Sequence, residues 1–142
     1  MTYRAIKINV LIQLLTVLLA VLLFVLPAKA DWTGAEIGKE IAWEFLHILD
    51  WGTTLDISDH PDDYCEVGLA RVFIGKNPSR SDVNIYMGLG AILHPVATHI
   101  IPQKAEIFGW EFSPRAWWQN VTIGGSGYCV GRNFSLGLRV NY

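Results

Sequence analysis

An apolar stretch near the start of the chain dominates its hydropathy pattern. Residues 8–26 (INVLIQLLTVLLAVLLFVL) carry no charge, and Arg4 and Lys7 precede them. A positive segment followed by an apolar one is typical of an export signal. The run is 19 residues long, which is also about the length that spans a bilayer once. The pattern therefore predicts a signal peptide or a signal anchor.

The end of this segment carries a processing site. Pro27 breaks the helix, and Ala28-Lys-Ala30 has the small-x-small form that signal peptidase accepts. If the segment is not cut, its positive start holds the N-terminus in the cytoplasm. Both outcomes place residues 31–142 on the exported side. We expect residues 1–30 to be a signal peptide or signal anchor and 31–142 to be one helical membrane-associated domain.

The next segment, residues 34–57, alternates with the period of a helix. Its apolar set is Ile37, Ile41, Phe45, Ile48 and Leu55, and its polar set is Glu36, Glu40, Glu44, His47, Asp50 and Thr54. Steps of three, four and seven predict an amphipathic helix. It carries too many charges for a free lipid-facing span. Pro61 ends it, because the residue before a proline is pushed out of the helical region, and a loop through Gly75 follows.

A second helix is predicted from a capping residue followed by a proline. Asn77-Pro-Ser79 supplies this start. Residues 83–101 then run without a formal charge to Pro102, a length compatible with a bilayer span. Pro95 removes one backbone donor and would bend this helix, which is better tolerated where neighbouring helices pack around it.

A third helix is predicted from the same kind of start at Ser113-Pro114. Trp117 and Trp118 follow where aromatic residues anchor helices at a membrane interface. Gly127 and Gly131 match the small-xxx-small pattern that lets two helices approach closely. Since the uncharged stretch stops before Arg132, a third bilayer crossing is less secure than the second. We expect the glycine face to pack against the bent second helix or against a partner protein.

The C-terminus shows a competing pattern with a period of two. Phe134, Leu136, Leu138, Val140 and Tyr142 alternate with Ser135, Gly137, Arg139 and Asn141. A terminal strand of an outer-membrane β-barrel ends in this way. Eight strands would consume nearly all of the exported residues, and residues 34–57 have a helical period. The small barrel therefore stands as the alternative to a helical bundle.

Composition supports contact with lipid and argues against nucleic acid. Of the 142 residues, 51% are hydrophobic and only 17% are charged, which exceeds the apolar share of an ordinary soluble domain. The net charge is −2. Its basic residues are scattered instead of forming the patch that a phosphate backbone requires.

Few residues suggest chemistry. His94 and His99 are five positions apart, which separates them by about 140° around a straight helix, so a shared metal is awkward. The bend at Pro95 could alter this angle, with Asp50 or His47 completing a site. The alternative is that these histidines hydrogen-bond inside a helical bundle, and that Asp50 is a buried carboxylate that fixes helix register. We predict no cofactor, and catalysis is not evident.

The two cysteines, Cys65 and Cys129, would lie in a compartment that permits disulfides. One bridge between them is therefore a candidate. Its geometry is uncertain because one cysteine is expected in a loop and the other in a helix.

Several segments resemble a group of small envelope proteins of proteobacteria and their phages, for which no activity is established. They are Leu49–Ile57, His60-Pro61, Gly75–Ser79 and Asn133–Arg139. The resemblance implies a bacterial source and an all-helical membrane protein, and it transfers no site residues.

Together these patterns predict a mainly α protein, a small membrane bundle of two or three helices after its targeting segment. We expect an exported integral membrane protein of a bacterial or phage-modified envelope with a structural or protein-interaction role. Its partners would be the lipid bilayer and another envelope protein or a second copy of itself. The exported side of the inner membrane is the expected location and the outer membrane the alternative. A small membrane enzyme or metal-dependent protein using Asp50, His94 and His99 is the competing hypothesis.

Overall fold

The computed structural model of the chain describes residues 32–142, and the predictions for residues 1–31 lie outside this range. The chain divides into two units, Met1–Ala30 and Asp31–Tyr142, and only the second is described below. Within it the elements are α2 (Gly34–Asp59), α3 (Gly68–Ile74), α4 (Arg80–Ile100), β1 (Ala105–Ile107), β2 (Trp110–Phe112) and α5 (Pro114–Ser135). The mainly α prediction is confirmed.

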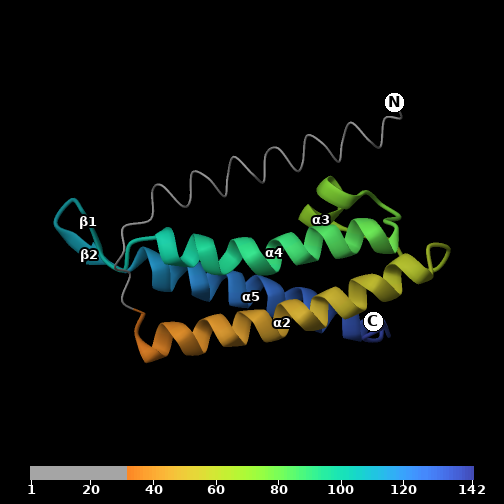
Figure 1. Cartoon of the computed structure of the whole chain (residues 1–142), viewed down its shortest axis with the longest axis horizontal. Coiled ribbons are helices and arrows are strands. Elements are labelled where there is room, and N and C mark those ends of the chain that lie inside the picture. Colours follow the sequence, from red (N-terminus) through yellow and green to blue (C-terminus); the bar gives the residue numbers. More distant parts are fainter. Residues whose placement is uncertain (1–31) are drawn as a thin grey trace. The chain divides into compact units, whose positions relative to one another are not determined.

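Three long helices lie side by side and form the body of this unit (Figure 1). Helix α2 packs against both α5 and α4, and the short α3 packs against α4. Strands β1 and β2 form an antiparallel hairpin, which projects from the end of the bundle where α4 finishes and α5 begins (Figure 1). Neither α3 nor the hairpin was predicted from the sequence.

Local capping explains where the long helices begin. At α2 the Thr33 side chain accepts from the Glu36 amide while the Glu36 carboxylate accepts from the Thr33 amide, which is a capping box. Ser79 and Asp82 form the same box at α4. At α5 Ser113 is the N-cap, and Pro114 occupies the first turn, where it removes no helical hydrogen bond. The predicted starts of the second and third helices are confirmed to within two residues.

The C-terminal segment does not form the strand that its period-two pattern had left open as an alternative. Helix α5 continues through Phe134 to Ser135, and residues 136–142 are irregular. They pack along α2: Leu138 is buried, and the Asn141 amide donates to the Gly52 carbonyl at 3.1 Å. The interpretation of the period-two pattern as a strand was wrong, because these contacts with α2 satisfy the segment without a partner strand.

The expected bilayer span over residues 83–101 is also corrected. This segment is helical as predicted and contains Pro95 within α4. Among residues 32–142, however, we find no helix with both the length and the apolar character needed to cross a membrane. Polar side chains such as Asn84, His94 and His99 lower the mean hydropathy of α4.

An apolar core occupies one part of the bundle. Leu55 of α2 packs with Val83 and Met87 of α4, and Trp51, Ile74 and Tyr86 surround them. Val83 is fully buried. This cluster lies at the half of α2 that is remote from the hairpin, and the other half is packed in a different way.

Candidate functional site

The first half of α2 buries its polar face. Glu36, Glu40, Trp43 and His47 are buried, whereas Ile37, Ile41, Phe45 and Ile48 are exposed, with Ile41 at 64% and Phe45 at 62%. An amphipathic surface helix normally turns its apolar stripe toward the core. The predicted alternation is therefore real, but the bundle uses it in the reverse sense. Its interior here is a polar core.

His94 of α4 is the centre of this polar core. Its Nδ1 lies 2.6 Å from Glu40 Oε1 on α2, and its Nε2 lies 2.9 Å from Thr122 Oγ1 on α5. The ring is stacked on Trp43, with centroids 3.6 Å apart, and lies against Trp118 on α5, at 5.3 Å. One histidine thus joins all three long helices.

Burial lowers the pKa of His94, although the Glu40 carboxylate acts in the opposite direction. The lowered pKa favours the neutral imidazole. Its Nδ1–H donates to Glu40, which leaves Nε2 to accept the hydroxyl proton of Thr122. Thr122 Oγ1 also lies 2.9 Å from the Trp118 carbonyl, so protonation of His94 would turn the single Thr122 proton toward that carbonyl.

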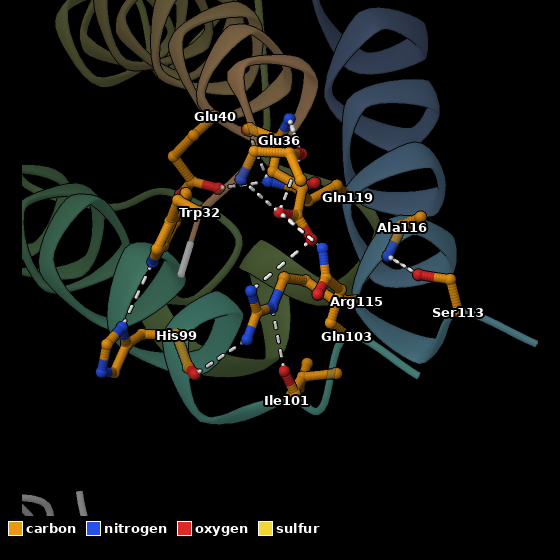
Figure 2. A network of polar contacts seen from close by, with 11 residues as sticks. Trp32, Glu36, Glu40, His99, Ile101, Gln103, Ser113, Arg115, Ala116 and Gln119 are labelled. Carbon is orange, nitrogen blue, oxygen red and sulfur yellow. Dashed lines mark hydrogen bonds and ion pairs between the residues drawn. The ribbon is translucent and has the colours of Figure 1, made fainter. Parts of the chain in front are cut away.

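A second network closes the core near the hairpin (Figure 2). Gln119 of α5 is fully buried, and its Nε2 donates to the Glu36 carbonyl at 2.9 Å and to Glu40 Oε2 at 3.1 Å. Buried Arg115 donates from Nε to the Ile101 carbonyl at 3.0 Å, and its Nη1 forms an ion pair with Glu36 Oε1 at 3.5 Å. These side chains tie the starts of α2 and α5 to the end of α4.

Asp50 and Glu66 form a third polar group. Asn133 of α5 donates from Nδ2 to Asp50 Oδ1 at 3.0 Å and to Thr53 Oγ1 at 2.8 Å. Burial raises the pKa of Asp50 to about 6, against the lowering effects of His47 and Asn133. Burial and the charge of Asp50 raise the pKa of Glu66 to about 7. The Glu66 Oε2 atom is buried without a hydrogen-bond partner.

The structure separates the three candidate metal ligands. His94 pairs with Glu40, His99 Nδ1 accepts from the Trp32 indole at 3.2 Å, and Asp50 pairs with Asn133. His47, which could have joined them, contacts the Met87 carbonyl at 2.9 Å. Within residues 32–142 no group of three or more histidine, cysteine, aspartate or glutamate side chains could hold a metal ion.

The structure also shows where the two cysteines and the two glycines of the predicted pairs lie. Cys65 and Cys129 are free thiols in this structure. A methyl group on Gly127 would meet Leu46 of α2 at an ordinary 3.8 Å, and one on Gly131 would meet nothing within 4 Å. Gly127 therefore faces α2 and not α4, and Gly131 lies at an open surface.

Other glycines allow the closest approaches. A Cβ on Gly90 of α4 would lie 3.0 Å from the His47 ring, and one on Gly52 would lie 2.5 Å from Val140. The sequence did not mark Glu40, Arg115, Gln119 or Asn133 as core residues. The helical period of residues 34–57 placed Glu36 and Glu40 on one face with His47. Nothing in the sequence showed that this face is the buried one.

Carboxylate, imidazole and hydroxyl stand in the order that can activate a hydroxyl nucleophile. Here Trp43 and Trp118 lie against the His94 ring. Two hollows of the described surface, of about 240 and 570 Å³, are lined by other residues. The arrangement joins α2, α4 and α5 through one imidazole ring. No protein-family model, curated protein or solved structure matches the chain.

Proposed function

We propose that residues 31–142 are an exported, membrane-associated structural or interaction domain of a bacterial envelope, with its apolar helix faces in contact with lipid. The observation that carries this proposal is the reversed distribution of side chains around the first half of α2. There, polar groups fill the interior while large apolar side chains face outward. In water such a distribution is unfavourable. Contact with lipid acyl chains removes that penalty.

The exposed apolar side chains come from every long helix. They include Ile37, Ile41, Phe45 and Ile48 on α2, Ile85, Ile92 and Ile100 on α4, and Trp117, Val121 and Tyr128 on α5. Soluble monomers rarely expose continuous apolar patches larger than a few hundred Å². Full burial of one such side chain contributes about 1.5–3 kcal/mol, so several half-exposed ones provide a substantial gain on moving to lipid.

The polar core fits the same environment. Where helix faces contact lipid, the hydrophobic effect contributes less to helix association, and interhelical hydrogen bonds contribute instead. Glu40, His94, Thr122 and Gln119 supply such bonds between α2, α4 and α5. We therefore assign these side chains a structural role, which is to hold the three helices together.

The envelope setting rests on the sequence. The apolar run 8–26 behind Arg4 and Lys7 is an export signal, and the resemblance described above is to envelope proteins. We propose the exported side of the inner membrane as the location. Lipid is the proposed partner, and association with another envelope protein or a second copy would add to it.

Cell fractionation tests this proposal. The full chain is expressed in a Gram-negative host, the soluble, inner-membrane and outer-membrane pools are separated, and the N-terminus in each pool is read by mass spectrometry. We expect an N-terminus at Asp31 in the inner-membrane pool. Release of the Asp31 form as soluble protein would overturn the proposal, and its recovery with the outer membrane would overturn the location.

A matched pair of variants isolates the apolar face of α2. Ile41→Glu places a charge on that face, and Ala42→Glu places the same charge on the adjacent exposed position. We expect Ile41→Glu to move a larger share of the Asp31 form into the soluble pool and Ala42→Glu to leave the distribution unchanged. If both variants distribute equally between the soluble and membrane pools, the apolar face of α2 does not contribute to membrane association. If the N-terminal segment is not cleaved and Met1 is retained, lipid quenching of a label at Phe45→Cys is the deciding measurement.

A further inference from the structure

The hairpin has one apolar and one acidic face. Ala105 pairs with Phe112, Glu106 with Glu111, and Ile107 with Trp110. Because side chains alternate across a strand, Ile107, Trp110 and Phe112 share one face and the two glutamates share the other. The two side chains nearest the turn are largely uncovered, with Trp110 80% exposed and Phe108 at the tip 96%. Ile107 and Phe112 are partly covered, at 53% and 43% exposed.

The tip places an aromatic residue where a turn disfavours it. Phe108 has φ +53° and Gly109 has φ +79°. Two-residue turns of this kind prefer Asn-Gly or Gly-Gly, and a left-handed conformation costs a bulky residue about 1–2 kcal/mol. Since Phe108 is almost fully exposed, contacts within the described chain do not offset that cost. A contact outside the chain would.

The hairpin projects from the end of the bundle that is richest in tryptophan. Trp32 at the start of α2 and Trp118 at the start of α5 both hydrogen-bond the end of α4, through His99 and Thr98, and Trp117 is exposed beside them. With Trp110, four of the six tryptophans gather here. Aromatic side chains collect at this density in the interfacial belts of membrane proteins.

In the sequence, the start of α2 closely follows the predicted targeting segment. The apolar run 8–26 ends seven residues before Thr33, and seven residues reach at most about 25 Å. If that run is retained in the bilayer, the start of α2 cannot lie far from the membrane surface. The hairpin base lies beside this start, because a hollow of about 240 Å³ is lined by Thr33 and Glu36 together with Gln103 and Ser113.

From these observations we propose that the hairpin end of the bundle sits in the headgroup region of a lipid bilayer, with Phe108 and Trp110 inserted. This inference rests on the proposed membrane association and adds the part of the surface that makes the contact. Lys39 and Lys104 line the hollow at the hairpin base, where ammonium groups can reach lipid phosphates. Glu106 and Glu111 stay in water on the opposite face.

A bilayer fits the hairpin better than a second copy of the chain does. Three aromatic side chains bury at most about 450–750 Å² when fully covered, and Phe112 is already partly covered. A specific protein interface needs about 800 Å² on each partner. An aromatic tip of this size is, however, sufficient to insert beside other lipid contacts.

Site-specific fluorescence tests the proposal on the full chain in phosphatidylcholine vesicles. In a Cys65→Ser, Cys129→Ser background, an environment-sensitive label is attached at Phe108→Cys, Phe45→Cys or Asp62→Cys. Quenching is measured with nitroxide-labelled lipid and with aqueous iodide. We expect lipid quenching at position 108 to be several-fold stronger than at position 62, with protection from iodide.

The other positions separate the two proposals. If position 108 is as open to iodide as position 62 while position 45 is quenched by lipid, hairpin insertion is overturned and membrane association stands. If neither 45 nor 108 is quenched by lipid, both proposals fail. Protection of position 108 from both quenchers identifies a protein occupant, which also overturns insertion.

Two further variants guard against effects of the label itself. A label at Glu106→Cys probes the acidic face and is expected to remain open to iodide, because insertion is one-sided. Trp110→Asp, with the label at position 108, should reduce lipid quenching toward the level at position 62 without changing the helical circular dichroism. Unchanged quenching in Trp110→Asp would contradict the role assigned to the apolar face.

Discussion

The two halves of α2 bury opposite kinds of side chain. Near the hairpin, α2 turns Glu36, Glu40 and His47 inward and leaves its isoleucines outside. Farther along, Leu55 is buried against Val83 and Met87 of α4. The same helix thus changes from polar to apolar packing along its length.

This difference shows what stabilises each half. The apolar half depends on area removed from water and on close packing, so the loss from a substitution scales with the volume removed. The polar half depends on paired donors and acceptors, so the loss depends on which partner remains unpaired. Substitutions confined to one half of α2 should therefore lower the free energy of unfolding in different ways for the two halves.

The largest effect is expected in the apolar half. Leu55→Ala should lower the free energy of unfolding by about 3 kcal/mol, because a cavity remains among Val83 and Met87. Ile41→Ala removes a similar side chain from the exposed face and should cost less than about 0.5 kcal/mol. Urea unfolding in mild detergent, followed by circular dichroism, measures both. Equal losses would contradict the burial pattern.

A somewhat smaller effect is expected in the polar half. Glu40→Ala removes the acceptor of His94 Nδ1 and Gln119 Nε2, and leaving buried donors unpaired costs about 1–3 kcal/mol. Glu44→Ala, one turn along, is the control. Because burial and Glu40 raise the pKa of Glu44, its removal should be neutral or slightly stabilising. A loss at Glu44 as large as at Glu40 would remove the distinction between them.

The boundary between the halves should respond to pH. Burial raises the pKa of Asp50 from 3.8 to about 6, so the folded state binds the proton more tightly than the unfolded state. Its contribution to stability is complete below about pH 4 and is lost as the pH rises through 6. Glu66, with a pKa of about 7, acts in the same direction. Unfolding at pH 5 should therefore require more urea than at pH 8.

Asp50→Asn tests the origin of this dependence. The amide oxygen can still accept from Asn133, but the group no longer ionises. At pH 8 we expect the variant to be more stable by about 1–2 kcal/mol, less than the ~3 kcal/mol of the full shift, because Asp50 is partly exposed to solvent. The dependence of stability on pH should become weaker, and the dependence that remains should be the part due to Glu66. The slope is measured by urea unfolding between pH 5 and 8. An unchanged slope would show that the pH dependence comes from groups other than Asp50.

The smallest effects are expected at two glycines. Gly90→Ala brings a methyl group within 3.0 Å of the His47 ring and should destabilise by about 1 kcal/mol through that overpacking. Gly131→Ala meets open space and should stabilise by about 0.5–1 kcal/mol through helix propensity. Thermal unfolding should show melting temperatures that move in opposite directions. A loss of stability in Gly131→Ala would instead support a packing role for that glycine.

The long helices could be predicted from local sequence. Thr33 with Glu36, and Ser113 with Pro114, mark helix starts through contacts within three or four residues. The period of residues 34–57 predicted both faces of α2. The hairpin was missed because its turn uses Phe108-Gly109 instead of a pair typical of such turns.

The core and the site needed the tertiary structure. Helical period defines two faces but does not say which is buried, and here the polar face is buried because Glu40 finds His94 and Gln119 on other helices. The same contacts separate His94 from His99 and Asp50, which the sequence had left open as metal ligands.

The sequence by itself determined the helix starts and the amphipathic period of α2, because these depend on neighbours within one or two turns. The tertiary structure decided which face turns inward, which carboxylate meets which histidine, and where the aromatic hairpin emerges. The physical reason is separation along the chain: Glu40 and His94 are 54 positions apart, and only the packing of α2 against α4 brings them within hydrogen-bonding distance.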